Sequence, residues 1–294
     1  MKQLKNLFRR LDKLPTVVIF CLPALVGFAV FWFYPMYKAI DLGFHRYNLI
    51  SARKLWNGLG NYQNAINDSL LWLSVRNTVL YFLLEVPPQM ALAFCLALLV
   101  KRGPAWLRTI ILLPTVTSVV VVSVIWGLMY HPNSGLINSF LQVAGLPTQP
   151  FLTSQKQALP SIALLMIWKN VGFSMLFYLA GLMAIPGVYY ESAMTDGAGS
   201  IQRLWYITIP LLRRTTVFLL LTNTISAFKV FTPVYIITGG GPVNATRLVV
   251  LYIFENAFRF NKMGYASALS ILLALFLLAV SVYSLRISSS RRKS

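Results

Sequence analysis

Long apolar runs alternate with shorter polar stretches along this chain. Six runs are at least 20 residues long, and they cover residues 16–36, 72–99, 109–130, 159–184, 215–237 and 266–285. A helix needs about 20 mostly apolar residues to cross the roughly 30 Å of hydrocarbon in a bilayer. The pattern therefore predicts an all-α, polytopic membrane protein with six transmembrane helices.

The polar stretches are short, and the longest covers residues 37–71. None is long enough to fold as a separate soluble domain, which typically needs 50 residues or more. We therefore expect one membrane domain over 16–286, flanked by basic cytoplasmic tails at 1–15 and 287–294. Residues 1–36 resemble a signal peptide, but the apolar run is long and lacks a small-x-small cleavage site, so we expect a retained first helix.

Composition supports a membrane location, since 57% of residues are apolar and 11% are charged, against roughly 25% charged in soluble domains. The formal charge of +19 is concentrated in the tails and in alternate polar stretches. This bias follows the positive-inside rule and predicts that both termini are cytoplasmic. Nucleic-acid binding is not expected, because no basic domain with interleaved aromatic residues is present.

Signals for catalysis and metal binding are lacking in the sequence. Cys21 and Cys95 lie in apolar runs and behave as small hydrophobic residues. His45 and His131 are far apart and lack metal-ligand spacing. The phosphate-binding pattern Gly-x-x-x-x-Gly-Lys-Ser/Thr does not occur. We therefore expect no metal site, no cofactor and no ATP hydrolysis in this chain, which would not be an enzyme.

A polar loop at 185–214 joins the fourth and fifth apolar runs. Its composition predicts a short helix at 188–196 and a second at 201–208. Gly197 permits a tight reversal between them, and Ser200 is expected to cap the second helix.

The same loop contains an ordered motif. It reads Glu191, Ala193, Asp196-Gly197-Ala198, Ile207 and Pro210. This order resembles the EAA loop of binding-protein-dependent ABC importer permeases, whose pattern is approximately Glu-Ala-Ala-x-x-Asp-Gly-Ala. The family pattern continues with Phe and then Ile-x-Leu-Pro. The chain departs from it at Ser192, which replaces the second Ala, at Leu204, which replaces Phe, and at Ile209, which replaces Leu. The resemblance implies that an ATPase is coupled through Glu191, Ser192, Ala193, Asp196, Gly197, Ala198 and Pro210.

Further motifs extend the resemblance over residues 16–286, among them Gly60-Asn61-Tyr62, Trp168-Lys169 and Gly240-Gly241-Pro242. They are similar to carbohydrate permeases of the maltose and glycerol-3-phosphate type, and specifically to the first of two different permease subunits. The implied partners are a second permease in a heterodimer, two ABC ATPase subunits, an extracytoplasmic solute-binding protein and membrane lipid. ATP and Mg would bind to the ATPase partner, and the location would be the bacterial plasma (inner) membrane.

Four charged residues fall within the apolar runs, namely Arg76, Glu85, Lys169 and Lys229. A charge at mid-bilayer costs about 2.5–3.5 kcal/mol on insertion scales, so each needs protein, water or a counter-charge. Arg76 can snorkel to the outer surface. Glu85 precedes Pro87-Pro88, which should kink the second helix. Lys169 or Lys229 could pair with Glu85 structurally, or one of them could line a substrate cavity.

Two stripes of polar side chains follow helical spacing. Asn170, Ser174 and Tyr178 recur every four residues, and Asn223, Ser226 and Lys229 recur every three. They could form hydrogen bonds between helices or bind sugar hydroxyls. The candidate substrate path therefore comprises Glu85, Lys169, Asn170, Ser174, Tyr178, Asn223, Ser226 and Lys229.

An ion-coupled secondary transporter that uses Glu85 and works without an ATPase is the alternative function. The small size, the lack of visible inverted repeats and the EAA-like loop argue against it. Neither function identifies the sugar from the sequence.

Overall fold

The computed structural model describes residues 14–101 and 103–289. Within these ranges five helices are long and apolar enough to cross a membrane, and a sixth span results if a bent helix pair is counted as one. The predicted all-α membrane fold is confirmed, and the strands found among the described residues form one two-stranded sheet. Most of the predicted tails at 1–15 and 287–294 lies outside the described residues.

The chain divides into two compact units. The first contains residues up to Asn67 together with Glu255–Leu273, and the second contains Asp68–Phe254 together with the residues from Ala274 onward. Helix α16, Met263–Ser289, contributes to both.

The first unit starts with a long apolar helix and continues into a small hairpin. Its elements are α2 (Leu14–Phe28), the π-helical turn η1 (Ala29–Phe33), α3 (Tyr34–Gly43), β1 (His45–Tyr47), β2 (Lys54–Trp56), α4 (Gly60–Ile66) and η4 (Glu255–Arg259). The first span was expected to end at residue 36, but the helix continues to Gly43. Pro35 does not stop it because it follows the π-helical turn η1, where the hydrogen bonds shift to i→i+5 spacing, as from the Tyr34 amide to the Ala29 carbonyl.

The Gly60-Asn61-Tyr62 motif has a structural role in this unit. The buried Asn61 donates through Nδ2 to the carbonyls of Gly43 and His45, both at 2.9 Å. It thereby satisfies the backbone where α3 gives way to β1.

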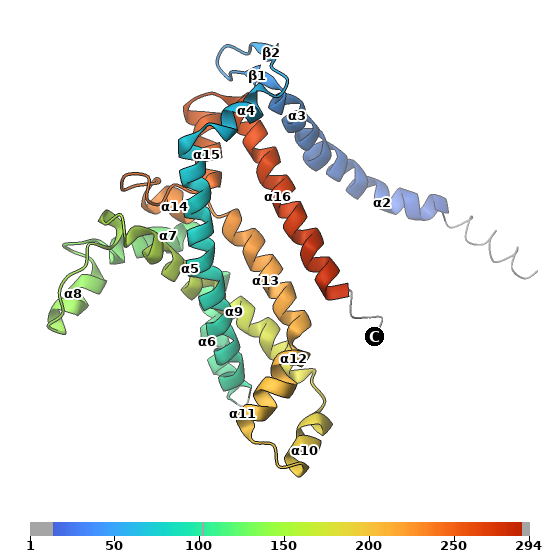
Figure 1. The fold of residues 1–294 in the computed structure, drawn as a ribbon, viewed down its shortest axis with the longest axis vertical. Coiled ribbons are helices and arrows are strands. Elements are labelled where there is room, and N and C mark those ends of the chain that lie inside the picture. The colour runs from blue at the N-terminus through green and yellow to red at the C-terminus, as the bar shows by residue number, and fades with distance from the viewer. Residues whose placement is uncertain (1–13, 102, 290–294) are drawn as a thin grey trace, which may run out of the picture. The chain divides into compact units, whose positions relative to one another are not determined.

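The second unit is a helical bundle (Figure 1). Its elements are α5 (Ser69–Val100), α6 (Ala105–Val116), α7 (Val119–Met129), α8 (Leu136–Val143), the 3-10 turn η2 (Phe151–Thr153), α9 (Ala158–Met183), α10 (Gly187–Thr195), α11 (Ser200–Arg203), the π-helical η3 (Leu204–Thr208), α12 (Ile209–Leu211), α13 (Arg213–Phe228), α14 (Thr232–Ile237) and α15 (Val249–Phe254).

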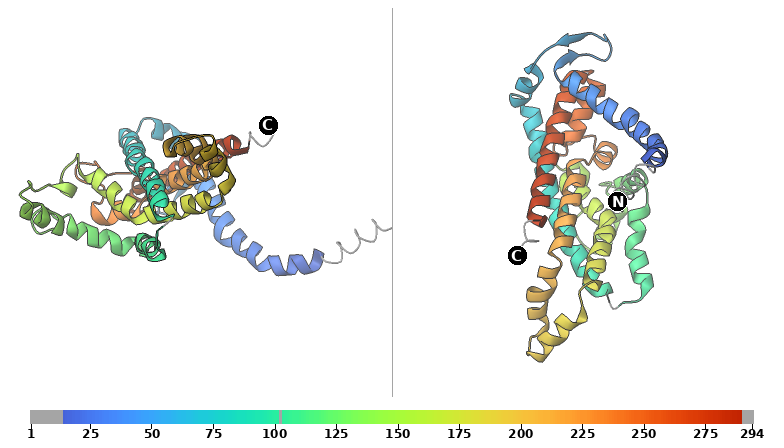
Figure 2. Two further views of the ribbon diagram at one scale, coloured as in Figure 1. Left: turned by 90° about the horizontal axis from the view of Figure 1, so that it is seen from below. Right: turned by 90° about the vertical axis from the view of Figure 1, so that its right-hand side faces the viewer.

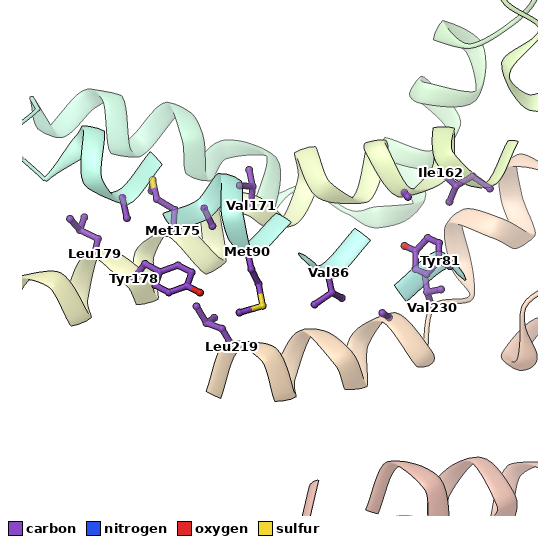
Figure 3. Packing of buried hydrophobic residues seen from close by; sticks show 14 of the residues in the cluster. Tyr81, Val86, Met90, Ile162, Val171, Met175, Tyr178, Leu179, Leu219 and Val230 are labelled. Carbon is purple, nitrogen blue, oxygen red and sulfur yellow. The ribbon is translucent and has the colours of Figure 1, made fainter. Parts of the chain in front are cut away.

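Helices α5, α9 and α13 pack together and form the core of this unit. Figure 3 shows Tyr81, Val86 and Met90 of α5 facing side chains of α9 and α13. The second and fourth predicted helices, 72–99 and 159–184, are confirmed as α5 and α9 within a few residues. Helix α5 begins at the side chain of Asp68, which accepts from the Leu70 and Leu71 amides, and it continues through Pro87 and Pro88.

The third predicted span, 109–130, is wrong as a single helix. It consists of α6 and α7, which meet at 93°. Thr117 and Ser118 are extended between them, with ψ of 149° and 131°, and the Thr117 hydroxyl donates to the Pro114 carbonyl. The two halves have different neighbours, because α6 packs on α9 and α7 packs on α14.

The fifth predicted span, 215–237, is also interrupted. Helix α13 ends at Phe228, with Lys229 as its C-terminal cap, and α14 starts at Thr232. Lys229 is therefore exposed beyond a helix end and does not lie inside a helix.

Candidate functional site

The predicted loop at 185–214 forms a hook of short helices at one end of the second unit, coloured yellow to gold in Figure 2. Helix α10, Gly187–Thr195, closely matches the predicted helix 188–196. The chain then reverses at Gly197, which has a φ of +79°. Only glycine adopts this conformation without steric cost.

The second helix of the hook is capped differently from the prediction. Its N-cap is Gly199, so the expected cap at Ser200 is wrong by one residue. The Gly199 amide donates to Oε1 of Gln202 at 2.8 Å, and the Gln202 side chain thus closes the first turn. The helix continues as π-helical η3 and then α12, which leads directly into α13.

Tyr190 connects the hook to the bundle. Its hydroxyl forms a hydrogen bond with Oγ1 of Thr208 in η3 at 3.0 Å. The Lys101 ammonium at the end of α5 lies 5.4 Å from the centre of the Tyr190 ring, which is within the range of a cation–π contact. The two contacts join α10 to η3, in the second arm of the hook, and to the end of α5.

The predicted coupling residues fall into two groups. Four of them, Ala193, Asp196, Gly197 and Ala198, line one hollow of about 380 Å³. The remaining ones, Glu191, Ser192 and Pro210, are exposed outside it.

The hollow also includes Ile207 of the motif and three residues that sequence reasoning missed, namely Gln202, Arg203 and Tyr206. They lie on the second arm of the hook. Only the reversal at Gly197 brings Gln202, Arg203 and Tyr206 opposite α10, so no local pattern indicates these three.

We expect Tyr190→Phe to weaken the attachment of the hook. The substitution removes the hydroxyl that pairs with Thr208 and keeps the ring against Lys101. A lost hydrogen bond typically costs about 0.5–1.5 kcal/mol, so the purified protein should melt at a slightly lower temperature and ATP-driven uptake should fall several-fold. Tyr189→Phe is the control, since Tyr189 is exposed. Equal uptake by the two variants would show that the Tyr190 hydroxyl has no part in coupling.

The polar stripe on α9 faces α5 within the bundle. The Gln89 amide donates to Oγ of Ser174 at 3.0 Å, and the Asn223 amide of α13 donates to the same oxygen at 3.2 Å. Ser174 is fully buried. This hydroxyl therefore links all three core helices.

Glu85 lies one turn from Gln89 on the same face of α5. Its carboxyl group interacts with the Tyr81 hydroxyl and the Asn170 side chain, although Oε2 of Glu85 and the Tyr81 hydroxyl are buried without a hydrogen bond of ordinary geometry. A buried polar atom that lacks a partner is costly. The carboxyl group is thus held in the bundle by incomplete polar contacts.

Of the two alternatives for these charges, an ion pair of Glu85 with Lys169 or Lys229 is not found in the part of the chain that the structure describes. Lys169 points to α6, where Nζ donates to the Thr115 carbonyl at 3.3 Å. The Thr115 hydroxyl donates in return to the Lys169 carbonyl at 3.0 Å. Since successive residues on a helix point about 100° apart, Asn170 faces Glu85 while its neighbour Lys169 does not.

The structure brings together part of the candidate substrate path. Glu85, Asn170, Ser174 and Asn223 form one cluster, and Tyr178 is buried nearby with its ring 5.5 Å from that of Phe94. Ser226 and Lys229 are exposed on the unit. Tyr81 and Gln89 were missed, although Tyr81, Glu85 and Gln89 recur every four residues on α5.

We expect Ser174→Ala to lower stability, because two buried amide donors lose their shared acceptor. Hydrogen bonds within membranes average about 0.6 kcal/mol each, so the melting temperature in detergent should fall by about 2–4 °C. Ser226→Ala removes an exposed hydroxyl and should leave the melting temperature unchanged. Identical melting curves for the two variants would contradict a bonding role for Ser174.

The sequence was compared with known protein families. Residues 5–293 match the family described as binding-protein-dependent transport system inner membrane component. The chain belongs to this family. It is therefore the membrane component of an importer, and ATP hydrolysis is the task of a separate subunit.

Curated relatives of the family share about a third of their residues with this chain. The probable ABC transporter permease YurN of Bacillus subtilis is 31% identical, over 91% of this chain and 94% of its own. The trehalose/maltose transport system permease MalF of Thermococcus litoralis is 32% identical over 92% of each chain. The glycerol-3-phosphate permease UgpA of Agrobacterium fabrum is 30% identical, over 92% of this chain and 93% of its own.

A solved structure has the same fold. It is a bacterial alginate ABC transporter in complex with an alginate pentasaccharide-bound periplasmic protein. One of its chains superposes with a TM-score of 0.83 at 23% identity, over 96% of this chain and 97% of that chain.

Proposed function

We propose that this chain imports a carbohydrate or a polyol phosphate, as one of two different permeases that enclose the translocation path. An extracytoplasmic binding protein delivers the substrate, and two ABC ATPase subunits bind ATP and Mg and power the cycle. Support for the substrate class comes from relatives named for glycerol-3-phosphate, sulfoquinovosyl glycerol and trehalose/maltose transport.

The observation that carries this function is the exposed hook. Glu191 is exposed, and its carboxylate has no hydrogen-bond partner within the described part of the chain. The neighbouring side chains of Ser192 and Ala193 are small. Because the hook extends beyond the bundle, packing of the bundle does not explain why these side chains are small. These features favour a docking surface for a partner subunit.

The contacts of the hook suggest how motion passes to the membrane helices. When the ATPases close, α10 is displaced, and Tyr190 transmits the displacement to η3 and to the end of α5. Helix α12 continues into α13. The displacement therefore acts on two of the three core helices, which is the kind of rigid-element switch that alternates access.

Substrate contacts are proposed on α9 and α13. Lys229 and Ser226 are exposed and Asn223 is half-buried, so a sugar in the path can reach them directly. Trp168 and Phe173 are also exposed, at 42% and 44%, and aromatic faces bind the C–H surface of sugars. Asn170 is half-buried like Asn223, and Lys169 is covered by α6. Ser174, Tyr178 and Glu85 are buried and become available only if α5 and α9 separate.

The proposed location is the bacterial inner membrane with both termini in the cytoplasm. The basic residues near the hook support this orientation, since Arg203, Arg213 and Arg214 all lie at that end.

Reconstitution tests the function. The permease pair, the ATPase and the binding protein should be placed in proteoliposomes, and uptake of a panel of sugars and sugar phosphates measured with ATP inside or outside. We expect uptake only with ATP on the hook side and only with a loaded binding protein. Uptake that is driven by an ion gradient without the ATPase would instead establish the secondary transporter.

A further inference from the structure

The hollow in the hook contains an unsatisfied donor. Arg203 lines it from the second arm, and its Nε is buried without a hydrogen-bond partner. Nε is closed to solvent, so an acceptor that enters the hollow meets the rest of the guanidinium group of this half-buried side chain, for which no hydrogen bond or ion pair is found within the described residues. The hollow is therefore chemically incomplete in the isolated chain.

The missing group is an acceptor with negative charge. Guanidinium groups bind carboxylates through paired, charge-assisted hydrogen bonds. Asp196 lines the same hollow but does not supply this bond, because it is exposed and the buried Nε stays unpaired. The solvated Asp196 carboxylate makes no ion pair with Arg203 within the described residues, so the charge of Arg203 stays available to a partner.

The charges around the hollow favour an acidic side chain of a partner. Lys101, Arg108, Arg213 and Arg214 lie near the same end of the unit. Arg108 is already engaged, since it donates to the Val100 and Lys101 carbonyls at the end of α5. Glu191 and Asp196 are the acidic residues within 185–214. The excess of positive charge complements an acidic surface.

We propose that the hollow receives an Asp or Glu side chain of the ATPase partner, with Arg203 as its ligand. The proposal rests on the proposed function and adds a contact of opposite polarity to that of Glu191. The hollow has a volume of about 380 Å³, near the lower end of the roughly 300–1,000 Å³ found for ligand pockets. It therefore admits one long side chain. Two contacts of opposite sign, one on each arm, would fix the direction in which the hook enters its partner.

Binding of the purified ATPase to the permease pair in nanodiscs tests this proposal. We expect Arg203→Ala to weaken binding at least tenfold. Arg203→Lys should restore part of the binding because lysine keeps the charge, and only part because lysine lacks the planar guanidinium group. Arg214→Ala is the control, because Arg214 is exposed outside the hollow, and it should bind nearly as well as the original protein.

A second measurement does not depend on the stability of the Arg203 variants. Ala198→Cys places a thiol in the hollow, and single cysteines replace the acidic surface residues of the ATPase in turn. We expect one ATPase position to form a disulfide efficiently. Unchanged binding by Arg203→Ala, or no crosslink at any acidic position, overturns the proposal. Failure of the original permease to bind any ATPase would instead refute the proposed function.

Discussion

Glu191→Lys should abolish most ATP-driven uptake while the protein still folds and reaches the membrane. The carboxylate is exposed and unbonded within the described residues, so its loss removes no stabilising contact. If it meets a basic group of the ATPase, a lysine replaces attraction by repulsion. A tenfold loss of affinity corresponds to about 1.4 kcal/mol, and we expect at least that for ATPase binding, with a similar fall in uptake.

Glu191→Gln separates charge from shape. It keeps the size and the hydrogen-bonding capacity of the side chain, so uptake should fall less than with lysine and should depend less on salt. Membrane levels and melting temperatures of both variants should equal those of the original protein. Normal uptake by Glu191→Lys would remove the hook from the coupling mechanism.

Gly172→Ala should destabilise the bundle strongly. Helices α6 and α9 approach so closely at this point that a Cβ on Gly172 would overlap the Ile111 carbonyl oxygen and come within 3.0 Å of Oγ1 of Thr115. A backbone carbonyl cannot rotate away, so α6 must shift and strain the paired contacts between Thr115 and Lys169. Overpacking of this kind costs about 1–3 kcal/mol, and we expect a melting temperature lower by several degrees and reduced accumulation in the membrane.

Gly127→Ala provides the matched control in α7. A Cβ at Gly127 would meet nothing within 4 Å, and alanine is the better helix former. The melting temperature of this variant should stay the same or rise slightly. Equal stability of Gly172→Ala and the original protein would contradict the close packing of α6 on α9.

The helices that the sequence predicts best are those whose ends carry their own signals. Helix α5 ends before Lys101 and α9 ends shortly before Pro186, so the apolar runs and the helices agree within a few residues. The bend between α6 and α7 was missed because apolar residues continue across Thr117 and Ser118. Hydropathy reports whether a segment suits lipid, but it does not report backbone direction.

In the candidate site, too, the features with a local sequence signal were predicted and the others were not. The spacing of the motif around Glu191 and Gly197 is local, and so the two arms of the hook were predicted. The hollow and the Tyr190 contacts depend on residues far apart in sequence, which no periodicity records. An ion pair of Glu85 with Lys169 or Lys229 does not form because Lys169 lies on the face of α9 toward α6 and Lys229 lies beyond the end of α13.

The break at Thr117 and Ser118 has a mechanical consequence. One half of the span is fastened to α9 through Thr115 and Lys169, and the other half rests on α14. A rotation about the two extended residues therefore changes the tilt of α7 without dragging α6. The two halves of the span are therefore held by different helices, so a displacement of α14 acts on α7 directly and on α6 only through this break.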